Sequence, residues 1–196
     1  MNKIDKIVKR VFDFSLALVG LLLTWPIILI AWIVATIETK SNGFFLQKRV
    51  GENGKLFTII KIKTMHNNKG STVTTANDSR ITKSGRFFRK YKIDELPQLI
   101  NVLKGDMSFV GPRPDVPGYA DRLKGEDRII LSVKPGITGP ATLKYKNEEQ
   151  ILAEVDDPVK YNNEVIWPDK VKINKEYIKN WSLKKDIEYI IKTVKG

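Results

Sequence analysis

The sequence of 196 residues contains no cysteine and only one histidine, His66. Without cysteine the chain can form no disulfide, no thiol nucleophile and no cysteine-ligated metal site, which is compatible with a cytosolic environment. A single histidine cannot form a metal-binding cluster. The chain therefore offers neither thiol chemistry nor a histidine-ligated metal site.

Acidic residues are also scarce, because 22 Asp and Glu stand against 34 Lys and Arg, a formal net charge of +12. A strongly basic chain is expected to have an anionic partner, such as nucleic acid, an acidic membrane surface or a phosphorylated substrate. The basic residues are dispersed along the chain, so nucleic acid is the weakest of these three candidates. The length suits one domain of ordinary size with a core of its own.

Charge is absent altogether from residues 14–37, "FSLALVGLLLTWPIILIAWIVATI". This run is longer than the roughly 20 apolar residues that a helix needs to cross a bilayer. It is too long for a cleaved signal peptide, and no small-residue cleavage site follows it. It is also apolar on all sides, which disfavours a buried helix of a soluble protein. The run therefore predicts a membrane helix.

Pro26 lies near the middle of this run and predicts a kink, because proline removes a backbone donor and clashes with the preceding turn. Basic residues flank the run on both sides, and positive charge marks the cytoplasmic side of a membrane protein. Two topologies fit: a kinked helix that spans the bilayer, and a re-entrant helix that bends at Pro26 and returns. The residues alone favour neither. The flanking basic residues are Lys3, Lys6, Lys9 and Arg10 before the run and Lys40, Lys48 and Arg49 after it.

The remainder of the chain has the pattern of a compact α/β domain. Two runs rich in apolar and β-branched residues surround the glycine-containing loop 51–54 and predict a β-hairpin over residues 44–65. Residues 66–80 are polar and aperiodic, as in a loop. Apolar residues at 96, 99, 100 and 103 predict a helix that stops at Gly105. Two more helices are expected over residues 171–180 and, after a Ser182 cap, over residues 183–194.

Asp94 and Glu95 stand side by side in "KYKIDELPQLINVLKG", residues 90–105 of this basic chain. One interpretation is a helix cap, because carboxylates stabilise the free N–H groups at a helix start. The other is a reaction centre, in which arginines bind phosphate oxygens and Mg²⁺ bridges carboxylate and phosphate. The spacing leaves both open. Basic residues in segments that could converge here are Lys61, Arg80, Arg89 and Arg113.

Three segments, "FTIIKIKTM", "FFRKYKIDELPQLINVLKGDMSFVGPRP" and "KPGITGPA", follow an apolar N-terminal helix that contains a proline. With this arrangement the chain resembles, from about residue 4 to the C-terminus, the bacterial sugar transferases called small monotopic phosphoglycosyl transferases. The middle segment is the most specific, as one block of roughly two dozen residues. The resemblance implies an α/β membrane-associated fold. Residues 1–40 would form a re-entrant membrane helix broken at Pro26, and residues 41–196 a cytoplasmic catalytic domain with a β-hairpin and several helices, some at the membrane interface.

The resemblance also implies an activity. Such enzymes transfer a sugar-1-phosphate from a UDP-sugar to undecaprenyl phosphate and release UMP, the first membrane step of surface glycan biosynthesis, at the cytoplasmic face of the bacterial inner membrane. By resemblance, Asp94 is the nucleophile that forms a covalent phosphosugar intermediate and contacts Mg²⁺, and Glu95 deprotonates or positions the lipid phosphate. Lys61, Arg89 and Arg113 match the phosphate-binding basic residues. The implied partners are a UDP-sugar, undecaprenyl phosphate and membrane lipids, with downstream glycosyltransferases acting on the product and no nucleic acid.

The sequence departs from the pattern of this family at three places. Trp25 stands before Pro26, where many members have a polar residue, so a stabilising hydroxyl at the bend is in question. "PGITG" is followed by Pro-Ala rather than Leu-Ala-Gln, which removes a glutamine near the substrate. Residues 146–170 are longer than in the most compact members, and their acidic residues receive no role.

Two rival functions use the same features. A non-catalytic basic membrane adaptor would explain the charge and the apolar run, but it gives no reason for Asp94 and Glu95 among arginines. A Mg²⁺-dependent hydrolase of UDP-sugars or lipid phosphates would use much the same site. Release of UMP only in the presence of a polyprenyl phosphate distinguishes the transferase from both.

Overall fold

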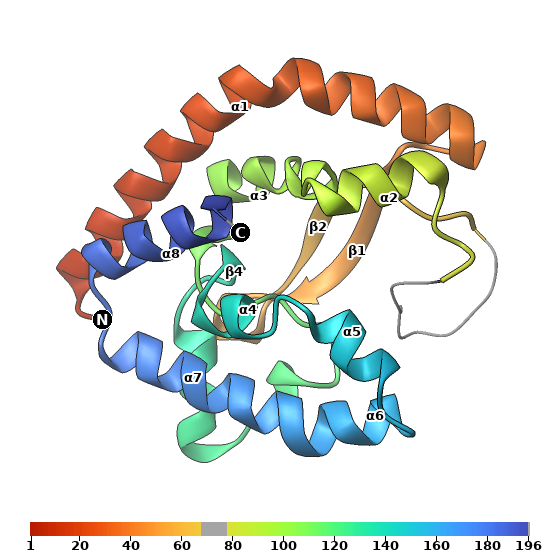
Figure 1. Cartoon of the computed structure of the whole chain (residues 1–196). Coiled ribbons are helices and arrows are strands. Elements are labelled where there is room, and N and C mark those ends of the chain that lie inside the picture. The colour runs from red at the N-terminus through yellow and green to blue at the C-terminus, as the bar shows by residue number, and fades with distance from the viewer. Residues whose placement is uncertain (68–77, 196) are drawn as a thin grey trace.

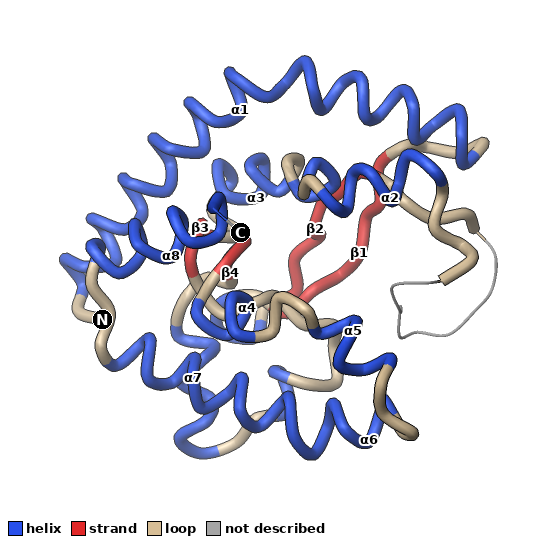
Figure 2. Tube along the Cα trace, viewed as in Figure 1, coloured by secondary structure: helices blue, strands red, loops and turns tan. Residues whose placement is uncertain are grey.

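The computed structural model describes residues 1–67 and 78–195, so most of the predicted loop 66–80 lies outside the described residues. Helices dominate, and the strands pair into two small sheets (Figure 2). The predicted mixture of helix and strand is confirmed. The helices are α1 (Lys3–Thr39), α2 (Lys83–Lys90), α3 (Gln98–Lys104), α4 (Pro140–Lys144), α5 (Glu148–Ala153), α6 (Pro158–Tyr161), α7 (Trp167–Lys179) and α8 (Leu183–Lys195). The strands are β1 (Phe44–Val50), β2 (Leu56–Ile62), β3 (Ser108–Val110) and β4 (Gly136–Thr138).

The long helix α1 arches over the rest of the molecule (Figure 1). Near its start, the Arg10 guanidinium donates hydrogen bonds to the carbonyls of Val102 at 2.6 Å and Leu103 at 2.7 Å. Near its end, the Glu38 carboxylate accepts from the backbone N–H groups of Lys83 at 2.9 Å and Ser84 at 3.3 Å. Both ends of α1 are therefore fixed to the same compact body.

The expected break at Pro26 is absent: α1 runs through Pro26 as a continuous helix that curves along its length. Proline has no N–H for the carbonyl of Leu22, which loosens the helix at this turn without ending it. The Thr24 hydroxyl donates to the carbonyl of Gly20 at 2.7 Å, a contact that favours bending. Thr24 thus supplies a hydroxyl close to the proline even though Trp25 stands directly before it.

The two faces of α1 differ in burial. Small buried residues, Ala17, Ala31 and Ala35, face the body and allow close packing. By length and composition α1 could cross a membrane, and only 17% of its most apolar stretch is buried, so it is no core helix. This pattern supports membrane association. The exposed large apolar residues of α1 are Ile4, Ile7, Val8, Val11, Phe14, Leu18, Val19, Leu22, Leu23, Trp25, Ile27, Leu29, Ile30, Ile33, Val34 and Ile37.

The predicted β-hairpin is confirmed, with β1 and β2 antiparallel over their full length. Strand β2 has buried residues on both of its faces, since successive residues of a strand point to opposite sides, whereas Leu46 and Leu56 of the hairpin are exposed. Phe57 and Ile59 pack with Leu99 of α3, whereas Ile62 packs with Ile28 in the second half of α1. The hairpin therefore links the helix that follows the acidic pair to the apolar helix.

A buried asparagine fixes α3 against the edge of β2. The Asn101 side chain accepts from the N–H of Ile60 at 3.1 Å and donates to the carbonyl of Thr58 at 2.8 Å. One amide thus satisfies backbone groups that an edge strand would otherwise leave unpaired. The predicted helix stop is also confirmed, since Gly105 adopts the left-handed conformation at the end of α3 with φ of +86°.

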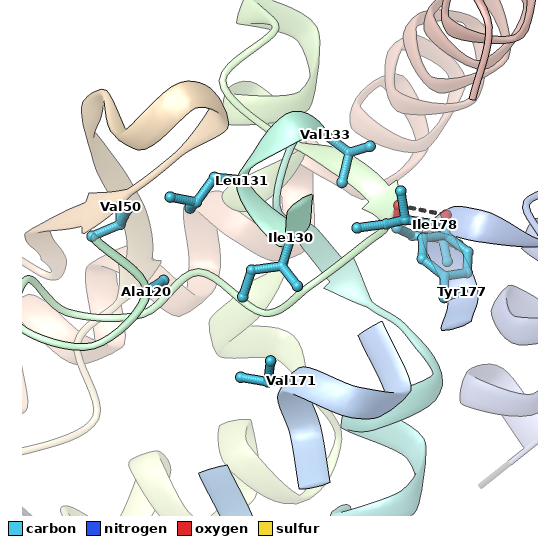
Figure 3. Close-up of a cluster of buried hydrophobic side chains, with 9 residues drawn as sticks. Val50, Ala120, Ile130, Leu131, Val133, Val171, Tyr177 and Ile178 are labelled. Atoms are coloured by element: carbon cyan, nitrogen blue, oxygen red, sulfur yellow. Dashed lines mark hydrogen bonds between the residues drawn. The ribbon is translucent and has the colours of Figure 1, made fainter. Parts of the chain in front are cut away.

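A further core cluster joins the end of β1, the 3₁₀ helix η4 (Gly125–Ser132) and α7 (Figure 3). Among its members, Tyr177 places its hydroxyl oxygen 3.2 Å from the carbonyl oxygen of Val110, at the end of β3. Residues following β3 are therefore anchored to the C-terminal helices. The cluster consists of Val50, Val110, Ala120, Ile130, Leu131, Val133, Val171, Tyr177 and Ile178.

The two predicted C-terminal helices are confirmed as α7 and α8, although α7 already begins at Trp167. Asp186 of α8 is fully buried and accepts hydrogen bonds from Tyr177 at 2.7 Å and Trp181 at 3.0 Å. It also forms an ion pair with the buried Lys9 of α1. A buried charge is tolerated only when it is paired and hydrogen-bonded, and this one joins the first helix to the last.

Candidate active site

Asp94 and Glu95 lie in a short 3₁₀ turn, η2 (Ile93–Glu95), between α2 and α3. Lys92, just before the turn, adopts a left-handed backbone conformation with φ of +56°. The interpretation of Asp94 as the cap of the next helix is wrong. Pro97 occupies the N-cap position of α3, and no side chain caps that helix. The 3₁₀ turn and Pro97 separate the acidic pair from α3, so its carboxylates are available for other contacts.

Glu95 joins two of the predicted basic residues. Its Oε1 lies 2.9 Å from the Lys61 ammonium and 3.3 Å from a guanidinium nitrogen of Arg113. Lys61 shares the face of β2 that carries the buried Phe57 and Ile59, so the strand directs its side chain into the body. Side chains from three distant segments meet at one oxygen atom.

Asp94 has a different environment. It is buried, and its Oδ1 has no hydrogen-bond partner among the described residues. Burial, reinforced by the neighbouring Glu95 carboxylate, raises the pKa of Asp94 to about 6, against the opposing charges of Lys61, Lys92 and Arg89. A buried carboxylate oxygen without a partner is unusual and indicates a site for a ligand or reaction.

The pKa of Glu95 moves the other way. Burial disfavours its charged form, but the charges of Lys61 and Arg113 outweigh burial and hold the pKa far below its usual range. Burial lowers the pKa of Lys61, although Glu95 partly restores it, and the Glu95 charge raises the pKa of Arg113. Two adjacent carboxylic acids therefore have pKa values that are pushed apart, a pattern typical of sites that assign different roles to each acid.

The loop that carries Arg113 is held by close backbone packing between β3 and β4. The N–H of Gly111 donates to the carbonyl of Thr138 at 2.9 Å, and the N–H of Gly136 donates to the carbonyl of Pro112 at 2.8 Å. A Cβ atom added to Gly136 would lie 2.1 Å from the nitrogen of Gly111. The "GPRP" and "PGITG" segments thus meet backbone to backbone, which is why glycine is required there and how Arg113 is positioned.

The other predicted residues have distinct places. Arg89 donates from Nε to the Thr64 hydroxyl at 3.0 Å, and its charge acts on Asp94, so it belongs to the same site. Arg80 forms an ion pair with Asp78 at 2.6 Å. Pro26 lies within α1, where it affects the curvature of the helix, and it is not part of the cluster around Asp94 and Glu95.

Several charged residues next to Arg113 were missed from sequence alone. Arg49, at the end of β1, donates to the carbonyl of Pro114 at 3.2 Å. Asp115 and Glu148 both act electrostatically on Arg113, and Glu148 pairs with Lys170 at 2.6 Å. The only sequence signal was the acid that follows "GPRP". Residues 146–170 contribute Glu148 and Lys170 to these surroundings only because the segment folds back towards the "GPRP" loop.

The arrangement suits phosphate chemistry. Lysine and arginine bind phosphate oxygens, and a carboxylate with a free oxygen can attack phosphorus or bind a hard cation. Within residues 1–67 and 78–195, no group of three or more His, Asp and Glu side chains could hold a metal ion.

Known proteins are similar in sequence to this chain along nearly its whole length. Residues 4–196 match the bacterial sugar transferase family. The chain is 38% identical to the uncharacterised sugar transferase EpsL of Bacillus subtilis, over 96% of this chain and 86% of the relative. It is 34% identical to the UDP-glucose:undecaprenyl-phosphate glucose-1-phosphate transferase of Escherichia coli, over 99% of this chain and 41% of the relative.

A third relative is the undecaprenyl-phosphate galactose phosphotransferase of Salmonella typhimurium, 34% identical over 97% of this chain and 40% of the relative. The chain thus spans less than half the length of these last two proteins and most of the Bacillus protein. The match to the family extends over the hairpin, the acidic pair and both glycine-containing segments, which confirms the resemblance. This chain belongs to the bacterial sugar transferase family.

Proposed function

We propose that this protein transfers a sugar-1-phosphate from a UDP-sugar to undecaprenyl phosphate and releases UMP. The observation that carries the proposal is the pairing of a buried, unpartnered Asp94 with a Glu95 that holds Lys61 and Arg113. The names of relatives support it, since they include transferases of glucose-1-phosphate and phosphotransferases of galactose that act on undecaprenyl phosphate.

The reaction is proposed to proceed in two displacements at phosphorus. In the first, an oxygen of Asp94 attacks the phosphorus bonded to the sugar, the bond to the bridging oxygen breaks, and UMP leaves with that electron pair. The sugar phosphate is then bound to Asp94 as an acyl phosphate. In the second, a phosphate oxygen of undecaprenyl phosphate attacks the same phosphorus and displaces the Asp94 carboxylate. The product is an undecaprenyl diphosphate sugar, and Asp94 is regenerated.

Glu95 is proposed to act first as an anchor and then as a base. In the free protein it orients Lys61 and Arg113 towards the site. Phosphate oxygens of a substrate compete for the same cations. As these cations turn to phosphate, Glu95 loses the charges that lower its pKa and becomes a better proton acceptor for the incoming lipid phosphate.

Mg²⁺ is proposed as the cofactor. Magnesium is usually held by one or two carboxylates together with substrate phosphates and water. The free Oδ1 of Asp94 fits this requirement, whereas Oε1 of Glu95 already contacts the cations of Lys61 and Arg113. When bound, Mg²⁺ would neutralise negative charge that develops on the diphosphate. Lys61, Arg89 and Arg113 would orient the phosphates.

We further propose that α1 is re-entrant, entering and leaving the cytoplasmic face of the inner membrane. At about 1.5 Å per residue, α1 is roughly 55 Å long, well beyond the roughly 30 Å of a bilayer core. Since Arg10 and Glu38 both contact the same body, a straight spanning path is hard to reconcile with the packing. Exposed aromatic residues of α2 and its end, Phe87 and Tyr91, would lie at the membrane interface.

The absence of native cysteine allows a clean test of this topology. Lys3 is exposed, and unlike Asn2 it does not cap α1. A membrane-impermeant thiol reagent is expected to leave Lys3→Cys unlabelled in intact cells and to label it after permeabilisation, as for Lys124→Cys in the domain. Labelling of Lys3→Cys alone from outside would indicate a spanning helix. Pro26→Ala should straighten α1 and move some molecules into that spanning form.

The activity itself is tested with purified protein, a UDP-sugar, Mg²⁺ and a polyprenyl phosphate. Without lipid, the expected result is at most one equivalent of UMP per enzyme, from the first displacement alone. Release beyond that equivalent is expected only when the lipid is present. Lipid-independent, multiple-turnover release would indicate a hydrolase. No release with any UDP-sugar, together with binding to anionic vesicles, would favour the membrane adaptor.

Arg113→Lys tests the phosphate-binding role of Arg113. Lysine keeps the charge but loses the planar fork that binds two phosphate oxygens. The Arg113 side chain is 47% exposed, and its ion pair with Glu95 is long at 3.3 Å, so the melting temperature should scarcely change. Activity is expected to fall at least about 10-fold, as for loss of one charge-assisted hydrogen bond. Arg122→Lys, at an exposed position, is the matched control. A clear fall in melting temperature together with the loss of activity would indicate that Arg113 stabilises the loop instead.

A further inference from the structure

Asp115 lies in a charged cluster that continues the active site beyond Arg113. The backbone at this point is fixed to the end of β1. The N–H of Val50 donates to the carbonyl of Asp115 at 2.9 Å, and the Arg49 guanidinium donates to the carbonyl of the preceding Pro114 at 3.2 Å. The position of Asp115 relative to Arg113 is therefore set by the hairpin, as the positions of Lys61 and Glu95 are.

The groups that surround Asp115 are charged and come from separate parts of the chain. Arg49, Arg113 and Lys170 attract its carboxylate, and Glu148 repels it. Lys170 and Glu148 pair with each other at 2.6 Å, and both are largely buried. The helices α5 and α7 thus bring the segment 146–170 to the same place as the "GPRP" loop.

The Asp115 carboxylate itself has no partner within bonding distance in the described part of the chain. It is partly buried, and this burial raises its pKa to about 6 despite the three cations. It resembles Asp94, which is more deeply buried and has one oxygen without a partner among the described residues. A carboxylate held in this way has strong capacity to accept hydrogen bonds that the protein does not use.

The chemistry of Asp115 restricts what it can contact. A carboxylate repels the diphosphate of a nucleotide-sugar, but it accepts hydrogen bonds from hydroxyl groups. Arg113 is proposed to bind the diphosphate, and Asp115 follows it by two residues. Hydroxyl groups lie on both sides of the diphosphate, on the sugar and on the ribose.

We infer that Asp115 is a donor-binding residue, whose carboxylate accepts hydrogen bonds from neighbouring hydroxyl groups of the nucleotide-sugar while Arg113 binds its phosphates. This inference rests on the proposed function and deepens it. Asp115 thereby contributes to the choice of donor but not to the binding of the lipid, which supplies a phosphate and a hydrocarbon chain without such hydroxyls.

The experiment compares Asp115→Asn with the wild-type protein in the full lipid-dependent assay. Asparagine keeps the shape but replaces one acceptor oxygen by a donor. The KM for the UDP-sugar is expected to rise about 10- to 100-fold, as for loss of hydrogen bonds to a charged group, while the KM for the polyprenyl phosphate stays within about 2-fold. Asp156→Asn, an exposed acid that the site does not use, is the matched control.

Inhibition by UMP then distinguishes the two sources of hydroxyl groups. If Asp115 contacts the ribose, the inhibition constant of UMP rises by the same factor as the donor KM. If it contacts the sugar, the UMP constant is unchanged and the ranking of UDP-sugars alters. Either result supports the inference. An unchanged donor KM, or equal changes for donor and lipid, overturns it.

A structural role for Asp115 is tested separately. Asp115→Glu keeps the charge, so a donor-binding role predicts partial recovery of the donor KM relative to Asp115→Asn. If both variants melt at lower temperature with reduced turnover and unchanged donor KM, Asp115 supports the loop and the inference is wrong. Failure of the proposed function would look different, because the wild-type protein would then show no lipid-dependent release of UMP.

Discussion

Asp94→Asn is expected to reduce turnover by several orders of magnitude and, in the absence of Mg²⁺, to raise the melting temperature. Asparagine lacks the nucleophilic carboxylate and is a poor ligand for a hard cation, so the first displacement is lost. If the acid served only to cap a helix, Asn would replace it almost without effect. Asp94 does not cap α3 in the structure, so loss of a cap cannot explain an effect of this substitution.

The stability effect follows from the raised pKa. The folded protein holds the Asp94 proton up to about pH 6, whereas the unfolded chain releases it near 3.8, so folding stability falls as pH rises through this interval. A pKa raised by about 2 units lowers the free energy of unfolding of the wild type by about 3 kcal/mol at neutral pH. Asparagine does not ionise, so the Asp94→Asn protein avoids this loss. Melting curves of both proteins from pH 4 to 8 in EDTA should therefore diverge as the pH rises.

Asp156→Asn is the control for this comparison, because it removes an exposed carboxylate of the same type. It should change neither turnover nor the pH dependence of melting. An Asp94→Asn protein with near-normal turnover would rule out the covalent mechanism. One that unfolds at lower temperature than the wild type would show that Asp94 stabilises the fold.

Glu95→Gln should have the opposite effect on stability and a smaller effect on turnover. Its carboxylate is the partner of the largely buried Lys61, and removing one member of a buried ion pair costs about 3–5 kcal/mol when nothing replaces it. Glutamine still offers an acceptor oxygen, so we expect a loss towards the lower end of this range. Loss of a proton acceptor lowers the rate by about 10²- to 10⁴-fold.

The two variants also differ in the intermediate that they allow. Glu95→Gln retains Asp94, so a labelled sugar phosphate should accumulate on the protein when the lipid is added, because the second displacement is slowed. Asp94→Asn should take up no label. Glu154→Gln, at an exposed position, controls for the change of acid to amide. Label on the Asp94 variant would place the nucleophile elsewhere, and no label on either variant would favour a single direct displacement.

Local patterns were sufficient to predict much of the scaffold. The alternation in residues 44–65 and the glycines between the strands predicted the hairpin, and the same alternation places Lys61 on the face that reaches Glu95. The spacing of apolar residues before Gly105 predicted α3. These features depend on contacts within a few residues, where periodicity and turn chemistry decide the conformation.

The parts that could not be predicted depend on long-range contacts or on a single backbone angle. The left-handed Lys92 and the 3₁₀ turn move Asp94 away from the start of α3, and apolar spacing carries no information about either. The grouping of Arg49, Arg113 and Lys170 around Asp115 needs the strand end, the loop and α7 to meet. Their charges identify them as candidates only after the fold has brought them together.

The ion pair between Lys9 and Asp186 has a consequence for the order of events during synthesis. The two residues are 177 positions apart. At translation rates of about 5–20 residues per second, the ribosome makes Lys9 roughly 10–35 s before its partner. During that interval the buried Lys9 ammonium lacks its ion-pair partner, and only the Asp13 carboxylate of the same helix offsets its charge. The start of the first helix therefore does not yet have its final environment. The packing of the start of α1 is therefore completed only when α8, the last helix to be synthesised, brings Asp186 to Lys9.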